Sequence, residues 1–193
     1  MRIALVCFDG MEELDLVGPW EVLRMWQLNW PEDGLEVLTM SLDGEAVTCA
    51  KGMRIVTDMP ADSDPVDVVV YPGGQGTRAQ IGDERIRGWL QEKAAGGALM
   101  TSVCTGSLVF ADAGLLRNRP ATTYWSELAT LAAIDPSIEL RPDDRFVDSG
   151  EVVTAAGVSA GIDMALHLVA RLHSKERARE VKKAIQYDPA PPI

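Results

Sequence analysis

The sequence predicts a three-layer α/β fold, in which helices cover both faces of a mostly parallel sheet. Apolar segments of strand length alternate with segments whose apolar residues have helical spacing, and this alternation is typical of parallel sheets. The four segments of strand length are 3–8, 35–42, 66–71 and 98–103. They are mostly apolar along their whole length, as expected of strands that are buried on both faces.

The first strand ends at Asp9-Gly10, and the first helix is expected over 20–28. Gly18-Pro19 precedes that helix, and proline is well tolerated at the first position of a helix. Asp15 is therefore expected in the link between the first strand and the first helix.

A small hairpin is expected after the second strand, because 45–49 and 53–58 flank the turn residues Ala50-Lys51-Gly52. After the third strand, a helix is expected over 83–97, which begins with an aspartate and ends with glycines.

Beyond the fourth strand, 105–114 predicts a short helix. A hairpin is expected over 145–156, followed by helices over 159–172 and 174–186 and an extended proline-rich tail. We find no repeat, linker or low-complexity segment, so residues 1–193 are expected to form a single domain.

Composition excludes several classes of function. Among 193 residues, 18 are basic and 29 acidic, and the net charge of −11 repels the phosphates of nucleic acids. No apolar run approaches the roughly 18 residues of a membrane span, and the opening MRIALVCF is too short for a signal peptide. Three widely spaced cysteines fit neither a disulfide framework nor a metal clip. We therefore expect a cytoplasmic protein that acts on a small molecule, without nucleic-acid or membrane partners.

Cys104 is the candidate nucleophile. It stands between the fourth strand and the helix over 105–114, which is the arrangement of a nucleophile elbow. Small neighbours such as Gly106 suit the crowded backbone of that turn. The N-terminus of the helix is expected to favour the thiolate. The alternative is a small buried cysteine without a chemical role.

A glycine-rich loop, 72–76, follows the third strand at the same predicted edge of the sheet. Its bare backbone is expected to approach the site and donate N–H groups to an anion. Residues 74–79 also match the dinucleotide pattern G-x-G-x-x-A. We reject that interpretation, because the pattern belongs to the first strand–helix turn and no helix is expected to open on these glycines.

Asp15 is the candidate acid–base group, since a carboxyl group beside a thiolate in a dry pocket holds a proton near neutral pH. Glu12 and Glu13 lie in the same link, so spacing alone does not choose among the three, and a solvated loop acid is an open alternative. His167 and His173 fall on the late helical segment, where a structural role is expected. A Cys–His catalytic pair is therefore not predicted.

Taken together, these residues resemble the ThiJ/PfpI superfamily over essentially the whole chain and, within it, the isocyanide hydratases. The resemblance is carried by LDLVGPWEVL (14–23), YPGGQGT (71–77), TSVCTGSLVFADAGLL (101–116), ATTYW (121–125), GVSAGIDMALHLVA (157–170) and YDPAPP (187–192). It implies a flavodoxin-like three-layer sandwich with a cysteine nucleophile elbow, a homodimer, and a reaction without metal or organic cofactor.

By position, the resemblance makes Cys104 the nucleophile and Asp15 the neighbouring acid. It places threonine, Thr105, where many members of the superfamily have histidine. The resemblance implies that Gly73, Gly74 and Tyr124 bind the substrate or its charged intermediates, although Tyr124 stands where the related pattern usually reads histidine. The implied reaction is the addition of water to an isocyanide, through a thioimidate on Cys104, to give an N-substituted formamide.

Two alternatives remain open on the sequence. One is another cysteine enzyme of the same superfamily, of the amidase, peptidase or glyoxalase type. The other is a redox or stress-response protein in which Cys104 is oxidised. A reachable thiolate with a low pKa would serve all of these roles.

Overall fold

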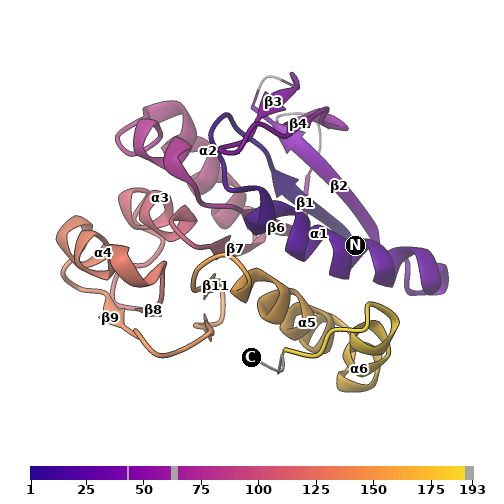
Figure 1. Ribbon diagram of the computed structural model, residues 1–193. Helices are drawn as coiled ribbons and strands as arrows, with labels where there is room; N and C mark the ends of the chain where they lie inside the picture. The colour runs from indigo at the N-terminus through magenta and orange to yellow at the C-terminus, as the bar shows by residue number, and fades with distance from the viewer. Residues whose placement is uncertain (43, 62–64, 190–193) are drawn as a thin grey trace.

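The central sheet has seven strands in the residues described by the computed structural model, which are 1–42, 44–61 and 65–189. The strands are β1 (Arg2–Val6), β2 (Glu36–Ser41), β5 (Met59–Pro60), β6 (Val68–Tyr71), β7 (Leu99–Val103), β10 (Phe146–Asp148) and β11 (Val152–Ala155). Their order across the sheet is β10-β11-β7-β6-β1-β2-β5 (Figure 1). Neighbours run parallel except at one edge, where β10 is antiparallel to β11.

Helices cover both faces of this sheet, as Figure 1 shows. One face carries α1 (Glu13–Asn29), α5 (Ala160–Leu172) and α6 (Lys175–Ala184). The other carries α2 (Glu84–Ala95) and α3 (Gly106–Asp112), with α4 (Leu128–Ile134) packed against α3. The protein therefore has the predicted flavodoxin-like α/β architecture.

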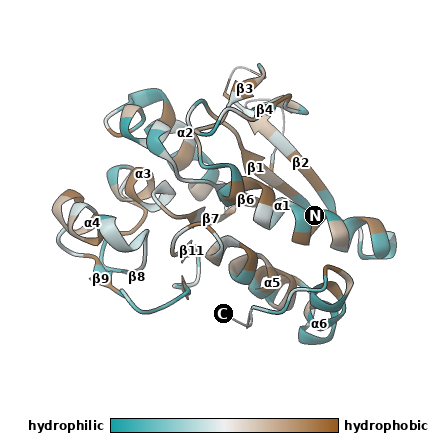
Figure 2. Cartoon of the chain, in the orientation of Figure 1, coloured by the Kyte–Doolittle hydropathy of each residue, from teal (hydrophilic) through white to brown (hydrophobic). Residues whose placement is uncertain are grey.

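The strands alternate between two hydrophobic cores. In β1, Ile3 and Leu5 face the core under α1 and α5, whereas Ala4 and Val6 face the core under α2 and α3. All four side chains are buried. Because successive side chains of a strand point to opposite faces, a strand between two helical layers is mostly apolar on both faces. Figure 2 shows this contrast between largely hydrophobic strands and hydrophilic outer surfaces, as on α6.

Helix α1 begins earlier than the sequence predicts. It starts at Glu13, so Asp15 lies in its first turn and not in a link before the helix, and Pro19 lies inside the helix. The ring of Pro19 takes up space against α5, where a Cβ atom on Gly161 would come within 3.1 Å of its Cγ atom. This close helix–helix approach explains why a residue that usually opens a helix is found within one.

Both predicted hairpins are present. Strands β3 (Val47–Thr48) and β4 (Arg54–Ile55) pair antiparallel, as do β10 and β11. Several short elements were not predicted, namely β5, β8 (Pro120–Ala121), β9 (Glu139–Leu140), α4 and the 3₁₀ turns Pro31–Asp33, Gln75–Ala79 and Trp125–Glu127. Elements of two to seven residues have too few positions for a periodic pattern to form.

No helix in the described ranges is both long and apolar enough to cross a membrane. The predicted extended tail lies partly outside the described residues. Within them, the Tyr187 hydroxyl group donates to Asp163 Oδ1 at 3.0 Å and holds the start of the tail against α5.

Candidate active site

Cys104 stands on a strained turn at the carboxyl end of β7. Its φ angle is +56°, in the left-handed region that residues other than glycine seldom occupy. Its N–H group donates to the carbonyl oxygens of Ala155 and Ala156 at 3.1 and 3.0 Å. Its own carbonyl oxygen accepts the hydroxyl groups of Ser107 and Thr123, each at 3.0 Å. These bonds hold the turn from both sides, and the predicted strand–turn–helix geometry at Cys104 is confirmed.

Gly106 permits the close packing of α3 on the end of β6. A Cβ atom at this position would lie 2.5 Å from the carbonyl oxygen of Tyr71 and 2.8 Å from that of Pro72. Both atoms belong to the backbone and cannot move aside cheaply. The run of small residues around Cys104 therefore has a steric cause.

Asp15 reaches the elbow from the first turn of α1. Its side chain is fully buried, and its Oδ2 atom accepts the N–H group of Gly73 at 2.9 Å. Its Oδ1 atom meets no hydrogen-bond donor within the described part of the chain. Glu12 and Glu13 turn instead toward Lys51. The structure thus distinguishes three acids that spacing did not separate.

Asp15 and Cys104 shift each other's pKa. Burial raises the pKa of Asp15 to about 7, opposed by the hydrogen bond from Gly73. Burial, reinforced by the negative charge of Asp15, raises the pKa of the Cys104 thiol to about 12. The backbone N–H groups of Thr105 and Val158 lower the pKa of the thiol but do not outweigh burial. The expected resting thiolate is therefore wrong: above pH 7 Asp15 is a carboxylate and Cys104 is a thiol.

The backbone N–H groups of Gly73 and Gly74 already donate hydrogen bonds within the protein. Gly73 donates to Asp15, and Gly74 donates to Thr105 Oγ1 at 2.9 Å. These N–H groups position the acid and the elbow instead of lying free for an anion, as the sequence led us to expect. A short 3₁₀ turn, Gln75–Ala79, also opens directly on Gly74, contrary to our expectation that no helix begins there.

Val158 is a residue of the site that the sequence did not reveal. Its φ angle is +48°, which is exceptional for a β-branched side chain. This backbone conformation brings its N–H group to the sulfur of Cys104. Gly157, directly before it, is the only local signal, and glycine before a helix is too common to identify such a position.

The sulfur of Cys104 borders a cavity of about 280 Å³. Its lining residues are Glu12, Ala50, Gly74, Gln75, Arg78, Cys104, Thr105, Tyr124, Ser126, Glu127 and Val158. Cys104 itself is 6% exposed, so a small molecule approaches it through this cavity. The volume corresponds to about nine water molecules, which suits a small organic substrate.

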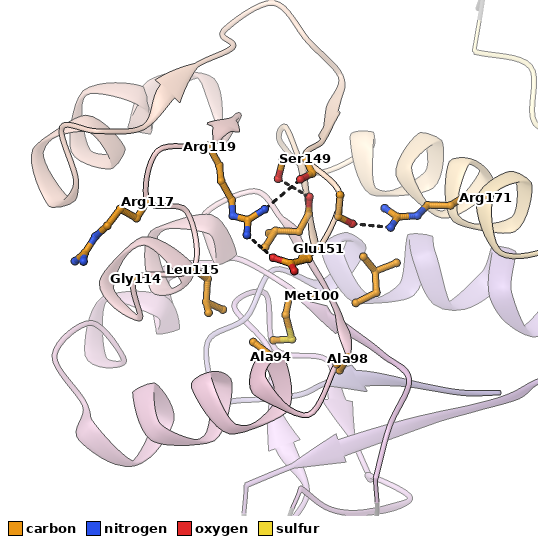
Figure 3. A pocket seen from close by; sticks show the side chains of 14 residues that line it. Ala94, Ala98, Met100, Gly114, Leu115, Arg117, Arg119, Ser149, Glu151 and Arg171 are labelled. Atoms are coloured by element: carbon orange, nitrogen blue, oxygen red, sulfur yellow. Dashed lines mark hydrogen bonds and ion pairs between the residues drawn. The ribbon is translucent and has the colours of Figure 1, made fainter.

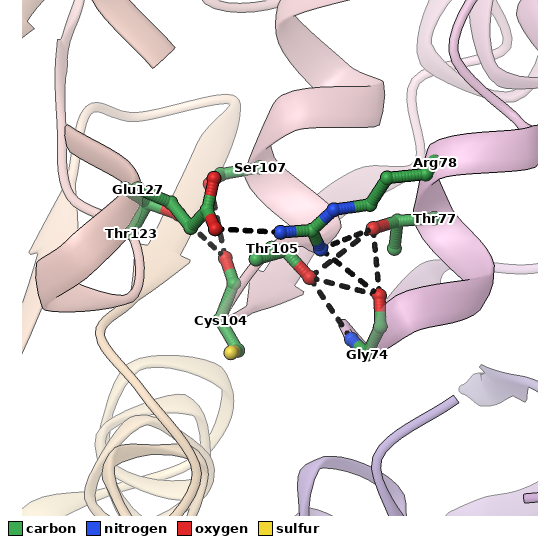
Figure 4. Close-up of polar contacts among 8 residues, drawn as sticks. All are labelled: Gly74, Thr77, Arg78, Cys104, Thr105, Ser107, Thr123 and Glu127. Atoms are coloured by element: carbon green, nitrogen blue, oxygen red, sulfur yellow. Dashed lines mark hydrogen bonds and ion pairs between the residues drawn. The ribbon is translucent and has the colours of Figure 1, made fainter. Parts of the chain in front are cut away.

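An ion pair joins two separate segments of the cavity wall. Arg78 binds Glu127 at 2.7 Å, and its guanidinium group also donates to the carbonyl oxygen of Gly74 at 3.2 Å. Thr77 Oγ1 lies 3.2 Å from Thr105 Oγ1, which completes a chain of contacts from Glu127 to the residue after the nucleophile (Figure 4).

Tyr124 covers the backbone at Gly157, where a Cβ atom would lie 2.3 Å from the tyrosine ring. It therefore packs against the segment that carries Val158. Its hydroxyl group forms no hydrogen bond to the described residues. Tyr124 also lines the Cys104 cavity.

The histidines lie elsewhere, as predicted. His167 Nε2 contacts Asp148 at 2.7 Å, and His173 Nε2 contacts Asp33 at 3.2 Å. Neither lines the Cys104 cavity. Among the described residues, no three His, Cys, Asp or Glu side chains are arranged to hold a metal ion.

A second cavity, of about 670 Å³, lies at the amino ends of β7 and β11, across the sheet from Cys104 (Figure 3). Its charged groups bind each other and the backbone. Arg119 contacts Glu151, and Arg171 donates to the carbonyl oxygen of Gly150. Its Ser149 hydroxyl group donates to the carbonyl oxygen of Val152 at 2.9 Å, and no cysteine of the described residues lines this cavity.

A comparison with protein families matches the DJ-1/PfpI family over residues 1–171. The chain belongs to this family. The resemblance seen in the sequence is thereby confirmed.

Relatives of this DJ-1/PfpI chain differ in what they do. An isonitrile hydratase from Pseudomonas putida is 36% identical over 100% of this chain and 81% of its own length. The HTH-type transcriptional regulator GbdR from Pseudomonas aeruginosa is 30% identical over 96% of this chain, which spans 50% of the regulator. A crystal structure of a ThiJ/PfpI family protein from Pseudomonas syringae superposes with a TM-score of 0.88, at 32% identity, over 100% of this chain and 77% of that one.

Proposed function

We propose that the protein is an enzyme that adds water to an isocyanide and releases an N-substituted formamide. The observation that carries the proposal is a fully buried carboxyl group, Asp15, whose charge acts on the thiol of Cys104 at the end of a small cavity. The likeness to an isonitrile hydratase over the full chain supports it.

In the first step, the sulfur of Cys104 attacks the terminal carbon of the isocyanide. The Asp15 carboxylate takes the thiol proton and delivers it to that carbon, so a C–S and a C–H bond form and the product is a thioimidate. The N–H groups of Thr105 and Val158 stabilise the negative charge on sulfur while it attacks. Covalent capture divides one difficult addition into two easier ones.

In the second step, water attacks the carbon of the thioimidate, and Asp15 again accepts a proton. The hydroxyl group left on the carbon gives its proton to the nitrogen as the C=O bond forms and the C–S bond breaks, and the sulfur recovers its proton from Asp15. The product is the N-substituted formamide, and the net reaction consumes one isocyanide and one water. A carboxyl group with a pKa of about 7 suits both transfers, because such a group gains and loses its proton readily near neutral pH.

The two alternatives have less support. Amidases and peptidases with a cysteine nucleophile use a neighbouring base such as histidine, and neither histidine of this chain lines the cavity. A redox sensor needs an accessible thiolate, whereas Cys104 is 6% exposed and burial raises the pKa of its thiol.

Formamide production from purified protein tests the proposal. We expect turnover with an isocyanide, none with a small amide or methylglyoxal, and none in Cys104→Ala. Turnover that survives in Cys104→Ala, or activity confined to one of the other two substrates, would reject the proposal.

We also propose that the enzyme is a homodimer. Leu14 and Val17 of α1 are 37% exposed, and Met53 and Val56 beside the β3–β4 hairpin are 39% and 82% exposed. Lys51 ties this hairpin to the start of α1 through Glu13, so the four apolar side chains belong to neighbouring segments. Light scattering of the purified protein is expected to give twice the mass of the chain, and Val17→Asp is expected to give the mass of one.

A further inference from the structure

Lys51 stands at the turn between β3 and β4 and is bound to the start of α1. Its ammonium group contacts Glu12 Oε1 and lies 3.7 Å from Glu13 Oε2. Its backbone N–H group donates to Glu13 Oε1 at 2.6 Å. The neighbouring Ala50 N–H group donates to the carbonyl oxygen of Met11 at 2.8 Å. The turn is thus fixed to the residues that directly precede Asp15.

This contact also forms part of the cavity wall. Glu12 and Ala50 line the cavity into which Cys104 opens. The side chain of Lys51 is 66% exposed, so its charge stands at the rim and not inside. A cation at the rim of a small cavity acts on the groups within it through space.

Two opposite charges at this rim act on the same buried carboxyl group. The negative charge of Glu12 raises the pKa of Asp15, and the positive charge of Lys51 lowers it. The interaction is mutual, because the contact with Glu12 and then the charges of Glu12, Glu13 and Asp15 raise the pKa of Lys51. Burial has the largest effect on the pKa of Asp15, and the charges of Glu12 and Lys51 change that pKa by smaller amounts.

Lys51 differs in charge from the other groups that act on Asp15. From the cap of its own helix, the charge of Glu12 acts on Asp15. The elbow presents the thiol of Cys104, and the glycine loop presents the N–H group of Gly73. Among the described groups that act on Asp15, Lys51 is the cation.

We infer that Lys51 is a positioning residue that sets the pH range of the Asp15–Cys104 pair, by neutralising Glu12 beside Asp15 with its own charge. The inference rests on the proposed function in taking this pair as the reacting groups. Lys51 touches neither substrate nor sulfur and acts only through its charge. Because that charge is exposed, its influence weakens as salt is added.

Alkylation of Cys104 as a function of pH tests this inference without any isocyanide. The rate of reaction with iodoacetamide, followed by mass mapping of the Cys104 peptide, is expected to rise through a midpoint set by Asp15. The inflection is expected to vanish in Asp15→Asn, which identifies it. Lys51→Met is expected to move the midpoint up by about half to one pH unit, since an opposite charge that favoured the carboxylate is gone.

Shifts of the alkylation midpoint in opposite directions in two variants distinguish an electrostatic role of Lys51 from a structural one. Glu12→Gln removes a negative charge and is expected to move the midpoint down, and the double variant Lys51→Met/Glu12→Gln is expected to return near the wild-type value. Lys51→Arg keeps the charge and the midpoint. Lys182→Met, which removes an exposed lysine from α6, is the matched control and leaves the midpoint unchanged.

An unchanged midpoint in Lys51→Met overturns the inference, as do shifts of the same sign in Lys51→Met and Glu12→Gln, or a wild-type profile that lacks the Asp15 inflection. The two proposals fail separately. The predicted shifts in a protein without isocyanide turnover reject only the proposed function, and isocyanide turnover with an unmoved midpoint rejects only the inference.

Discussion

Gly73 donates its backbone N–H group to the Asp15 carboxylate at 2.9 Å, and this bond joins the glycine loop after β6 to the first turn of α1. A Cβ atom on Gly73 would lie 2.5 Å from the backbone nitrogen of Thr105 and 2.9 Å from Asp15 Oδ2. The acid and the elbow are therefore held together by a position that accepts only glycine.

Catalysis is expected to depend on the ionisation of Asp15. Below its pKa of about 7 the pair holds two protons, and no base is present to accept the thiol proton. We expect kcat/KM for isocyanide hydration to rise with pH through a midpoint near 7 and to fall by two orders of magnitude or more in Asp15→Asn. A profile that is flat from pH 5 to 9 would contradict this assignment.

Asp15 is expected to destabilise the fold at alkaline pH. Its pKa is 3.8 in a model peptide and about 7 in the folded chain, so the folded state binds the proton more tightly. A raised pKa contributes stability below pH 3.8, and this contribution is lost as the pH rises through 7. Asp15→Asn is therefore expected to raise the free energy of unfolding at pH 8, relative to its effect at pH 4, by up to about 4 kcal/mol.

Chemical denaturation of the wild type and Asp15→Asn at both pH values measures this difference. The result would combine increased stability with lost activity in one substitution. Equal effects at the two pH values would show that the carboxyl group is not perturbed by burial.

Gly106→Ala is expected to destabilise the protein, because the new methyl group meets the carbonyl oxygens of Tyr71 and Pro72. A loss of about 2 kcal/mol or more in the free energy of unfolding is the usual scale for overpacking of this kind. Gly88→Ala is the matched control, since nothing lies within 4 Å of a Cβ atom there. That change, inside α2, is expected to stabilise by about 0.5–1 kcal/mol. Similar effects of the two substitutions would contradict the packing account.

The Arg78–Glu127 ion pair is expected to support catalysis through the contacts that lead to Thr105. Arg78→Met is expected to lower kcat/KM about tenfold, because the Gly74 loop loses a contact that helps to fix the elbow. Glu127→Gln is expected to lower kcat/KM little further once Arg78 has been replaced, so kcat/KM of the double variant Arg78→Met/Glu127→Gln tests whether the two residues act together. Effects that simply add would show two independent residues.

The sequence predicted the sheet, both hairpins and the elbow because these depend on local pattern. Buried strands such as β1 are apolar from Ile3 to Val6, and Cys104 stands between a clear strand and a clear helix. The start of α1 was misplaced, because Pro19 is a reliable signal for a helix start and only its packing against α5 shows why it lies inside one.

The chemistry of the site was harder to predict than its residues. The predicted ionisation state of Cys104 was wrong, because the sequence shows the N-terminus of a helix but not the burial that outweighs its effect on the pKa. The role of Val158 depends on a backbone angle, and that of Lys51 on contacts across 38 and 39 positions of chain, and neither leaves a periodic pattern in the sequence. Such features arise only when separate segments are packed together.

The most direct test of the account is the mass of the protein during turnover. Rapid quenching with an isocyanide in excess, followed by intact-mass and peptide analysis, is predicted to show one adduct equal to the full mass of the isocyanide, on the peptide that contains Cys104. Formamide production without that adduct, or with the adduct on Cys7 or Cys49, would contradict it.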